Sequence, residues 1–456
     1  MLPTCSLPSI KIRCGPLSFP SGTSLLRIEV RGNGLSQSLR LSKASATALF
    51  FTLTLSACGG SDSPAAPAGA SPAPAPMPVP PSPAPPPAMP ASLACPTPIG
   101  RVLTVGPGKQ YVTIRAAAAA SQSGDTIHIS AGEYRGDVAT WSADNLTICG
   151  VGGRAKLYAD GMHEGGKGIW VIAGSNTTIH SVAFHGARVP DQNGAGIRQE
   201  GPTLTLRDAG FYDNENGVLS GGGTNSTITI EYSEFARNGF GDGFTHNIYI
   251  GEVGALNVRY SFFHEAKVGH NLKTRARENT IENSYFADGA NGTSSYLLNF
   301  DNGGRAVVRG NLLHKGPAAN NSILISHYAN IWGASYNSLT LEHNTLVSTY
   351  SGGSFIDINT GANVTLTANI FAGIGNPSLL GGATAAQTSN VVTNASQIPG
   401  ASNIAAPNFW PAAALLPQLN LATSVVAGYS NDSPRPYAVR AITSTTRMIG
   451  ALQSPP

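Results

Sequence analysis

The stretch T-I-T-I-E-Y-S-E-F at residues 227–235 recurs, with changes, between residues 176 and 371. Successive copies are 23 to 33 residues apart. Two apolar columns pass through them, an aliphatic one and, five residues later, a mainly aromatic one: Ile179, Leu206, Ile230, Val258, Ile281, Val308, Leu341 and Leu366, then Phe184, Phe211, Phe235, Phe263, Phe286, Leu313, Leu346 and Phe371. Coils stacked about 4.8 Å apart and filled by such columns explain the recurrence. The sequence therefore predicts an all-β chain wound into a single-stranded parallel β-helix, a solenoid.

A third column is polar and supports the same fold. It lies three residues after the aliphatic column and holds Ser233, Ser261, Ser284, Asn311, Asn344 and Asn369. Asn tolerates tight turns, and its side chains can hydrogen-bond from coil to coil. Charged residues make up only 12% of the chain and glycines number 53, a composition typical of short strands and tight turns. A leucine-rich repeat would need a helix in every unit, and the repeat units here contain none.

The segment before the repeats predicts a cap. Residues 113–120 are rich in alanine and predict a short helix, and Gly124-Asp125 forms a turn into a strand. This arrangement resembles the N-terminal cap of bacterial right-handed parallel β-helix proteins, in which a small helix covers the open apolar end. We expect the β-helix with its cap to span residues 93–375, and residues 376–456 to hold the last coils and a closing segment.

The N-terminal region predicts export. Residues 1–57 form a signal region, with an apolar run at 44–57 that is too short to span a bilayer. Leu55-Ser56-Ala57-Cys58 resembles a bacterial lipobox, in which Cys58 would carry the lipid. Residues 58–92 then form a Pro/Ala-rich linker of extended polyproline II character. We expect a monomer tethered by a lipid anchor to the bacterial cell envelope, as an outer-membrane lipoprotein; an ordinary cleaved signal peptide is the alternative.

Two further expectations concern this half of the chain. The signal begins far from Met1, so we hypothesise that translation starts near Val30 or Leu35 and that residues 1–29 are not made. Cys95 and Cys149 are then the remaining cysteines of an exported protein. A disulfide between them and a pair of free thiols both remain open.

Three central segments carry the candidate site: H-N-I-Y-I-G (246–251), G-H-N-L-K-T-R-A-R (269–277) and Y-L-L-N-F-D-N-G-G (296–304). Aligning the coils by their Phe column places three apolar residues inward, Ile248, Leu272 and Leu298. Since side chains alternate along a strand, Tyr249, Lys273 and Asn299 then point outward in successive coils. Gly251, Arg275 and Asp301 follow one step further along the same face. A slip of one residue would reverse this facing.

The middle coil is cationic in a chain otherwise sparse in charge. Lys267, His270 and Arg277 accompany Lys273 and Arg275. A concentrated basic face suits an acidic polymer. Nucleic acid is not expected, because aromatic stacking platforms are missing and the protein is predicted to be exported. The sequence therefore favours a uronate-containing polysaccharide.

The residues K-T-R-A-R-E-N-T-I-E-N-S-Y-F (273–286) resemble a pattern in polysaccharide lyases of this fold, the pectate lyases and more closely the β-helix alginate and chondroitin lyases. The resemblance implies that Lys273 is the general base. The arginine of the family falls in the next coil, where this chain has Asn299 and Asp301, so Arg275 is the nearby substitute. In the family the lysine removes the C5 proton of a uronate.

The chemistry of such an elimination assigns the other candidates. Arg275, or a Ca²⁺ held by Asp301, would neutralise the uronate carboxylate, although no cofactor is required by the sequence. Tyr249, His246 or His270 would protonate the leaving oxygen. The like charges of Arg275 and Lys267 would lower the pKa of Lys273. Further substrate contacts are expected from Asn247, Asn271, Asn299, Lys267 and Arg277.

Three other interpretations remain open. In the first, Lys273 and Arg275 have no catalytic role and pair with Asp301 and Glu252 on a solvated face. A glycoside hydrolase would need two opposed carboxylates, with Asp242, Asp288 and Asp301 as candidates. A tethered β-helix that binds a glycan or a partner without catalysis would need only the scaffold and the linker.

Overall fold

The computed structural model describes two N-terminal strands and most of the chain after residue 94. The described residues are 27–32, 35–40, 95–328, 331–333, 335–358, 361–375, 378–381, 385–421, 429–430, 440–441 and 447–453. Strands β1 (Arg27–Gly32) and β2 (Leu35–Arg40) pair antiparallel within a first unit, Met1–Pro80. The apolar run 44–57, Cys58 and the Pro/Ala-rich linker lie outside the described residues, so the signal, the lipobox and the tether stay predictions. No described helix is long and apolar enough to cross a membrane.

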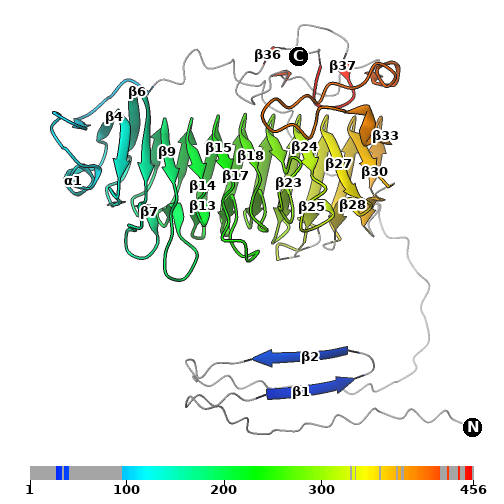
Figure 1. Cartoon of the computed structure of the whole chain (residues 1–456), viewed down its shortest axis with the longest axis horizontal. Coiled ribbons are helices and arrows are strands. Elements are labelled where there is room, and N and C mark those ends of the chain that lie inside the picture. Colours follow the sequence, from blue (N-terminus) through cyan, green and yellow to red (C-terminus); the bar gives the residue numbers. More distant parts are fainter. Residues whose placement is uncertain are drawn as a thin grey trace, which may run out of the picture. The chain divides into compact units, whose positions relative to one another are not determined.

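The second unit is a parallel β-solenoid, as predicted. Its strands form three walls, each made by stacking one strand from every coil (Figure 1). One wall is a separate sheet of 10 strands. Its members are β5 (Ala139–Trp141), β7 (Gly168–Ile172), β10 (Ala195–Gln199), β13 (Asn216–Ser220), β16 (Ile248–Ile250), β19 (Leu272–Thr274), β22 (Leu298–Phe300), β25 (Ile323–His327), β28 (Ser354–Ile358) and β31 (Ser378–Gly381).

The other two walls share a sheet of 21 strands. The first carries the aliphatic column and comprises β3 (Val102–Val105), β4 (Thr126–Arg135), β6 (Thr147–Tyr158), β8 (Thr177–His180), β11 (Leu204–Arg207), β14 (Gly223–Glu231), β17 (Val253–Arg259), β20 (Glu278–Glu282), β23 (Arg305–Arg309), β26 (Ser338–Glu342), β29 (Asn363–Thr367) and β32 (Ala386–Thr388). The second carries the aromatic column: β9 (Val182–His185), β12 (Gly210–Tyr212), β15 (Glu234–Ala236), β18 (Phe262–His264), β21 (Tyr285–Ala287), β24 (Leu312–Lys315), β27 (Thr345–Ser351), β30 (Ile370–Ile374) and β33 (Val391–Asn394). The long strands β4 and β6 run through both.

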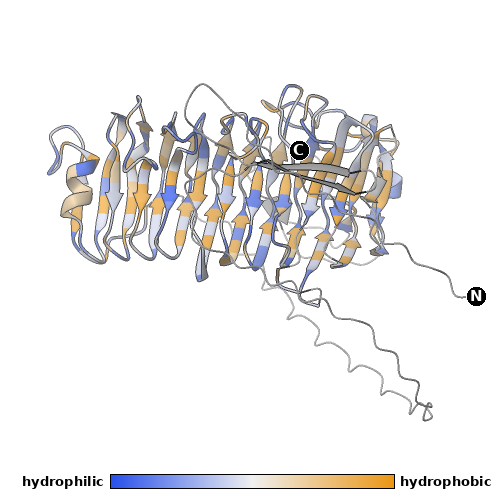
Figure 2. Cartoon of the chain, turned by 90° about the horizontal axis from the view of Figure 1, so that it is seen from below, coloured by the Kyte–Doolittle hydropathy of each residue, from blue (hydrophilic) through white to orange (hydrophobic). Residues whose placement is uncertain are grey.

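The core follows the columns read from the sequence. Leu206 pairs in register with Ile230, and Phe211 with Phe235. The Phe rings stack from Phe184 to Phe286 with centroids 4.5–5.1 Å apart, and each is wholly buried. Each buried Phe contributes about 1.5–3 kcal/mol relative to an exposed one. Apolar and polar residues alternate along the strands, as the colours in Figure 2 show, which fixes the facing of each strand.

Buried amides hold the turns of the coils. The Asn344 side chain donates to Asn369 Oδ1 at 2.9 Å, and the Asn369 side chain in turn donates to Asn390 Oδ1 at 3.0 Å. In earlier coils Ser233, Ser261 and Ser284 accept backbone N–H groups in the same way. The predicted polar column is therefore confirmed as a ladder that satisfies buried backbone donors.

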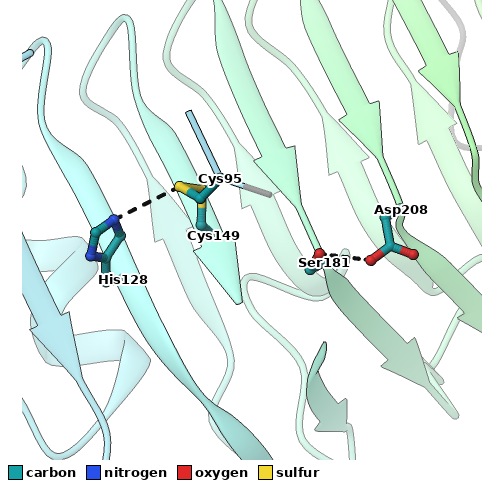
Figure 3. Close-up of a disulfide and its surroundings, with 5 residues drawn as sticks. All are labelled: Cys95, His128, Cys149, Ser181 and Asp208. Carbon is teal, nitrogen blue, oxygen red and sulfur yellow. Dashed lines mark hydrogen bonds between the residues drawn. A yellow bond between two sulfur atoms is a disulfide. The ribbon is translucent and has the colours of Figure 1, made fainter. Parts of the chain in front are cut away.

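The N-terminal cap also agrees with the prediction. Helix α1 (Ile114–Ala120) begins after Thr113, whose hydroxyl accepts the Ala116 N–H at 3.2 Å. Asp137 accepts the N–H groups of Ile114 and Arg115 at 2.6 and 3.0 Å, so the first turn of the helix is tied to the first coils. Cys95 and Cys149 form a disulfide with Cα atoms 5.8 Å apart, which settles the open alternative in favour of the bond (Figure 3).

The C-terminal segment lies along the flank of the solenoid. Short helices η1 (Ala395–Gln397) and η2 (Leu416–Gln418) and strands β34 (Asn420–Leu421) and β37 (Arg447–Met448) belong to it; β35 (Tyr429–Ser430) pairs with β36 (Arg440–Ala441). Ile398, Phe409 and Leu415 pack against outward residues of β18–β30, among them Phe262 and Tyr285. The described part of this segment covers one side of the solenoid, and its role in closing the end stays a prediction.

Candidate functional site

The outer face of the 10-stranded sheet carries the candidate site, in the predicted register. Tyr249 on β16 pairs with Lys273 on β19, and Lys273 with Asn299 on β22. The apolar partners Ile248, Leu272 and Leu298 are wholly buried inside the coil. The alternation of facing is thus confirmed for Tyr249 and Lys273, which are half-buried, whereas Asn299 in the same row is only 3% exposed.

Lys273, Arg275 and Asp301 form one charged cluster. Arg275 Nε donates to Asp301 Oδ2 at 2.8 Å, and Lys273 Nζ lies 3.4 Å from the same oxygen. The side chains of Lys273 and Asp301 are only 18% and 22% exposed, so their attraction is screened less than on an open surface. One carboxylate therefore serves as counterion for both cations.

Tyr249 completes the cluster. The Lys273 ammonium lies 5.1 Å and the Arg275 guanidinium 5.4 Å from the centre of its ring, both within cation–π range. Burial raises the pKa of Tyr249 above its ordinary value, against the opposing effect of Arg275. The phenol consequently holds its proton through the neutral range and is available as a donor.

His246 and His270 stack beside this cluster, with ring centres 4.6 Å apart. His246 Nδ1 accepts the backbone N–H of His270 at 2.9 Å, and His270 Nδ1 accepts that of Tyr296 at 3.2 Å. Since Nδ1 is an acceptor, the proton of each neutral ring sits on Nε2. Burial lowers the pKa of His270 to about 3 and that of His246 well below its ordinary value. These rings are therefore fixed, uncharged hydrogen-bond donors, and the predicted role of proton-delivering acid does not fit them.

Two of the predicted substrate contacts belong to the core instead. Asn247 and Asn271 are wholly buried and continue an amide ladder that begins at Asn214 and Asn238. The Asn247 side chain donates to Asn271 Oδ1 at 2.7 Å and to His264 O at 2.9 Å. They stand immediately before their strands, where the turn needs amide partners, so a substrate on the outer face does not reach them.

Two predicted cations lie away from the cluster. Lys267 Nζ pairs with Asp213 at 3.3 Å, at a turn where Arg237 binds the same carboxylate at 3.0 Å. The exposed Arg277 packs over the rings of Tyr336 and Trp332, with its guanidinium carbon 4.6 and 5.9 Å from their centres. Lys267 is therefore paired with Asp213 and does not belong to the cluster around Lys273.

The carboxylates proposed for a glycoside hydrolase are not arranged as an opposed pair. Asp288 is wholly buried and faces Lys315, 3.5 Å away. Asp242 caps its own loop by accepting the Phe244 N–H at 2.9 Å. Asp301 is held by the two cations. A substrate on the outer face thus meets only Asp301 of the three.

Metal binding has little support from the described residues, which contain no group of three or more His, Cys, Asp or Glu side chains suited to an ion. Asp301 would have to exchange both of its cationic partners for Ca²⁺. A hard cation takes several oxygen ligands, and Asp301 supplies one carboxylate.

The structure adds residues that the sequence comparison of coils missed. Asn299 pairs with Ser326 on β25, and Ser326 with Asp357 on β28, so the outward row extends past Lys273 to an acid. Burial raises the pKa of Tyr296, and the hydrogen bond of its side chain with Asn321 opposes this rise. The exposed Tyr328 follows β25 at the level of Asp301, its N–H bonded to Phe300 O at 3.0 Å. The alternation in S-I-L-I-S-H (322–327) and S-F-I-D-I (354–358) was the available signal.

Comparison with known proteins identifies a solved structure with the same fold. No protein-family model and no curated protein sequence matches the chain. The crystal structure of the pectate lyase Pel9A superimposes with a TM-score of 0.52 at 14% sequence identity, over 78% of this chain and 96% of that one. The chain shares its fold with a pectate lyase. The solenoid is accordingly a pectate-lyase-like right-handed parallel β-helix, the fold class expected from the repeats and the N-terminal cap.

Proposed function

We propose that this protein is a polysaccharide lyase that cleaves a uronate-containing polysaccharide by β-elimination on the outer face of β16, β19 and β22. The observation that carries the proposal is the cluster of a lysine, an arginine and a protonated tyrosine on one wall, with both cations within 5.4 Å of the Tyr249 ring. These are the three chemical groups that the reaction requires. The pectate lyase with the same fold supports an acidic polysaccharide as the substrate class.

Each group has a defined role in the elimination. Arg275 binds the uronate carboxylate and withdraws charge from C5. Lys273, acting as the base, takes the C5 proton, and the electrons of that C–H bond form the C4–C5 double bond. The bond from C4 to the glycosidic oxygen breaks, and this oxygen takes the proton of the Tyr249 hydroxyl. Proton transfer through solvent from the new ammonium to the phenolate restores the site.

Asp301 prepares this site in the absence of substrate. It holds Arg275 and Lys273 in one place through contacts of 2.8 and 3.4 Å. A uronate carboxylate has the same charge and the same bidentate shape, so it competes with Asp301 for the arginine. Substrate binding then exchanges one carboxylate partner for another without leaving a cation unpaired.

The proposal is tested by incubating the protein with alginate, polygalacturonate and unsulfated glycosaminoglycans and following the ultraviolet absorbance of the unsaturated product. We expect absorbance to grow with one of these polymers and Lys273→Met to abolish the growth. Lys156→Met is the matched control, since Lys156 is exposed on β6 and on a different wall. New reducing ends without unsaturation would indicate hydrolysis and would contradict the proposal.

A second candidate is a β-helix that binds the same polymer without cleaving it. It is favoured by the pairing of both Lys273 and Arg275 with Asp301, which would leave no free base. Retention on a polymer column, with no absorbance change over long incubation, would support binding alone.

The cellular setting is a further part of the proposal. We propose that Cys58 is lipidated and that residues 58–92 tether the solenoid to the cell envelope, as the lipobox-like L-S-A-C and the Pro/Ala-rich composition indicate. Labelling with a fatty-acid analogue, and loss of the label in Cys58→Ser, tests the anchor.

A further inference from the structure

The loop that leads into β16 exposes two phenylalanine rings beside the candidate site. The loop, Gly239–Thr245, lies between β15 and β16, and its Phe240 and Phe244 are 45% and 82% exposed. Every other phenylalanine among the described residues is buried. Apolar side chains that are exposed together mark sites of interaction. The two rings therefore indicate a binding surface.

Hydrogen bonds within the loop stabilise its conformation. The Phe240 N–H donates to Thr245 Oγ1 at 2.7 Å, and the Phe244 N–H donates to Asp242 Oδ1 at 2.9 Å. The Thr245 hydroxyl donates to the same carboxylate oxygen at 3.3 Å. Gly243 has a φ of 86°, a left-handed conformation that favours glycine. The rings are thus presented by a preorganised loop, which reduces the entropy cost of binding a ligand.

The next coil supports this loop from one side. A Cβ atom on Gly243 would lie 3.8 Å from the Cγ1 atom of Val268, so the valine side chain lies beside the loop. Val268 has a φ of 62°, which is unusual for a β-branched residue, and its N–H donates to Thr293 Oγ1 at 3.2 Å. Backbone strain of this kind is concentrated at binding sites. The half-buried Val268 extends the apolar surface of the loop to the coil that carries Lys273.

The loop is continuous with the charged cluster of the candidate site. His246 follows Phe244 by two residues, and its ring meets the ring of Tyr249 edge-on, with centres 5.5 Å apart. Tyr249 is five residues after Phe244, so their Cα atoms are at most about 18 Å apart. A sugar chain with one unit at Tyr249 and Lys273 therefore reaches Phe244 within a few units.

A sugar ring suits these phenylalanines better than a lipid surface does. The C–H groups on one face of a pyranose are apolar and pack on an aromatic ring, while the hydroxyl groups at the edge of the pyranose stay in water. This contact leaves Asp242, the exposed acid between the two phenylalanines, in water as well. Insertion of the loop into a bilayer would carry this carboxylate into the membrane together with the rings, which is costly.

We propose that Phe244 is a sugar-stacking platform that holds the polysaccharide on the side of the site where β16 begins, a few sugar units from the bond that is cleaved. The position of that bond rests on the proposed function. The platform adds a contact that does not depend on charge. It strengthens the binding of long chains and takes no part in the elimination itself.

Kinetics with oligosaccharides of different length test this role. For a polymer that the wild-type protein cleaves, Phe244→Ala should raise KM for hexasaccharides and longer chains about fivefold, the usual contribution of an aromatic contact, with kcat unchanged. KM for the shortest cleavable oligosaccharide should stay the same, and Phe244→Trp should retain the wild-type KM. Val112→Ala is the matched control, since Val112 is 70% exposed and lies next to α1.

Two kinetic outcomes would overturn the proposal. An unchanged KM for long chains would show that no sugar stacks on Phe244, and an equal rise for all chain lengths would show a general disturbance of the site. Vesicles of phosphatidylethanolamine and phosphatidylglycerol test the alternative partner. Vesicle binding by the wild-type protein that is lost in Phe244→Ala would assign the ring to a membrane instead.

Titration calorimetry with hexasaccharides measures the same contact without turnover and separates this proposal from the proposed function. Weaker binding by Phe244→Ala of a polymer that yields no unsaturated product would support the platform and remove the elimination. Cleavage that Phe244→Ala leaves unaffected would do the reverse. Absence of binding of every hexasaccharide to the wild-type protein would overturn both.

Discussion

Replacing Lys315 by methionine should destabilise the solenoid strongly, although this residue lies outside the charged cluster. Lys315 and Asp288 are both wholly buried, 3.5 Å apart. The lysine also donates to the carbonyl oxygens of Ser294, at 3.0 Å, and Ser295. Met fills a similar volume but carries no charge. The main effect on stability therefore comes from Asp288, which stays buried without its cationic partner. Breaking one side of a buried ion pair costs about 3–5 kcal/mol.

The cost depends on pH in a defined direction. Burial already raises the pKa of Asp288, and Lys315 opposes this rise. Without the lysine the pKa rises further, so the folded variant retains a proton that the unfolded chain releases above pH about 4. The penalty is therefore small in acid and grows as the pH rises through the folded pKa of Asp288. Ser294 and Gly316, which still donate to Asp288, limit it.

Urea unfolding at pH 5 and pH 7.5, followed by tryptophan fluorescence, measures this effect. We expect the Lys315→Met penalty to be larger at pH 7.5 and the double variant with Asp288→Asn to recover part of it. A loss below about 1 kcal/mol at pH 7.5, or a double variant less stable than Lys315→Met alone, would refute the reasoning. Because the pair holds the loop that delivers Tyr296 to His270, the folded variant should also bind substrate more weakly.

Three other predictions concern the site and the stability of the coils. Asp301→Asn should strengthen uronate binding several-fold in titration calorimetry, because a partly exposed ion pair is worth up to about 1 kcal/mol; weaker binding would show that Asp301 positions the cations more than it competes. Tyr249→Phe should lower kcat about 100-fold with little change in KM, the usual loss of a proton donor, and an unchanged kcat would assign the proton elsewhere. His264 hydrogen-bonds to Glu234 at 3.3 Å and to Glu265 at 2.8 Å. Burial disfavours the charged form of both Glu234 and His264, but these bonds outweigh it. They lower the pKa of Glu234 to about 2 and raise the pKa of His264. The melting temperature should thus fall as the pH drops from about 4.5 toward 2, and also as the pH rises above about 6.5. His264→Gln should reduce the fall of the melting temperature above pH about 6.5. An equal fall in the variant and the wild-type protein would contradict this.

The sequence determined the scaffold because each column has a single physical function. Aliphatic and Phe columns must face inward, and a side-chain period of two then fixes the outward residues of the next strand. Tyr249, Lys273 and Arg275 were found in this way, with the correct register. Their pairing with Asp301 could also be anticipated, since opposite charges on adjacent coils lie within reach.

The departures from prediction arise where the chain leaves its strands. Asn247 and Asn271 precede their strands by one residue, and only the turn geometry shows that their amides enter a ladder. Lys267 lies in a loop whose length differs between coils, so its partner Asp213 was not evident. Ser326 and Asp357 lie outside the three central segments that the sequence analysis singled out, on strands whose alternation at 322–327 and 354–358 was the available signal.

The most direct test of the account is the structure of the Lys273→Met protein bound to a uronate tetrasaccharide. The account predicts the sugar chain along the outer face of β16, β19 and β22, with a carboxylate on Arg275, the C5–H bond facing residue 273 and the glycosidic oxygen near the Tyr249 hydroxyl. A sugar chain bound on another wall, or one whose carboxylate contacts neither Arg275 nor its neighbours, would contradict it.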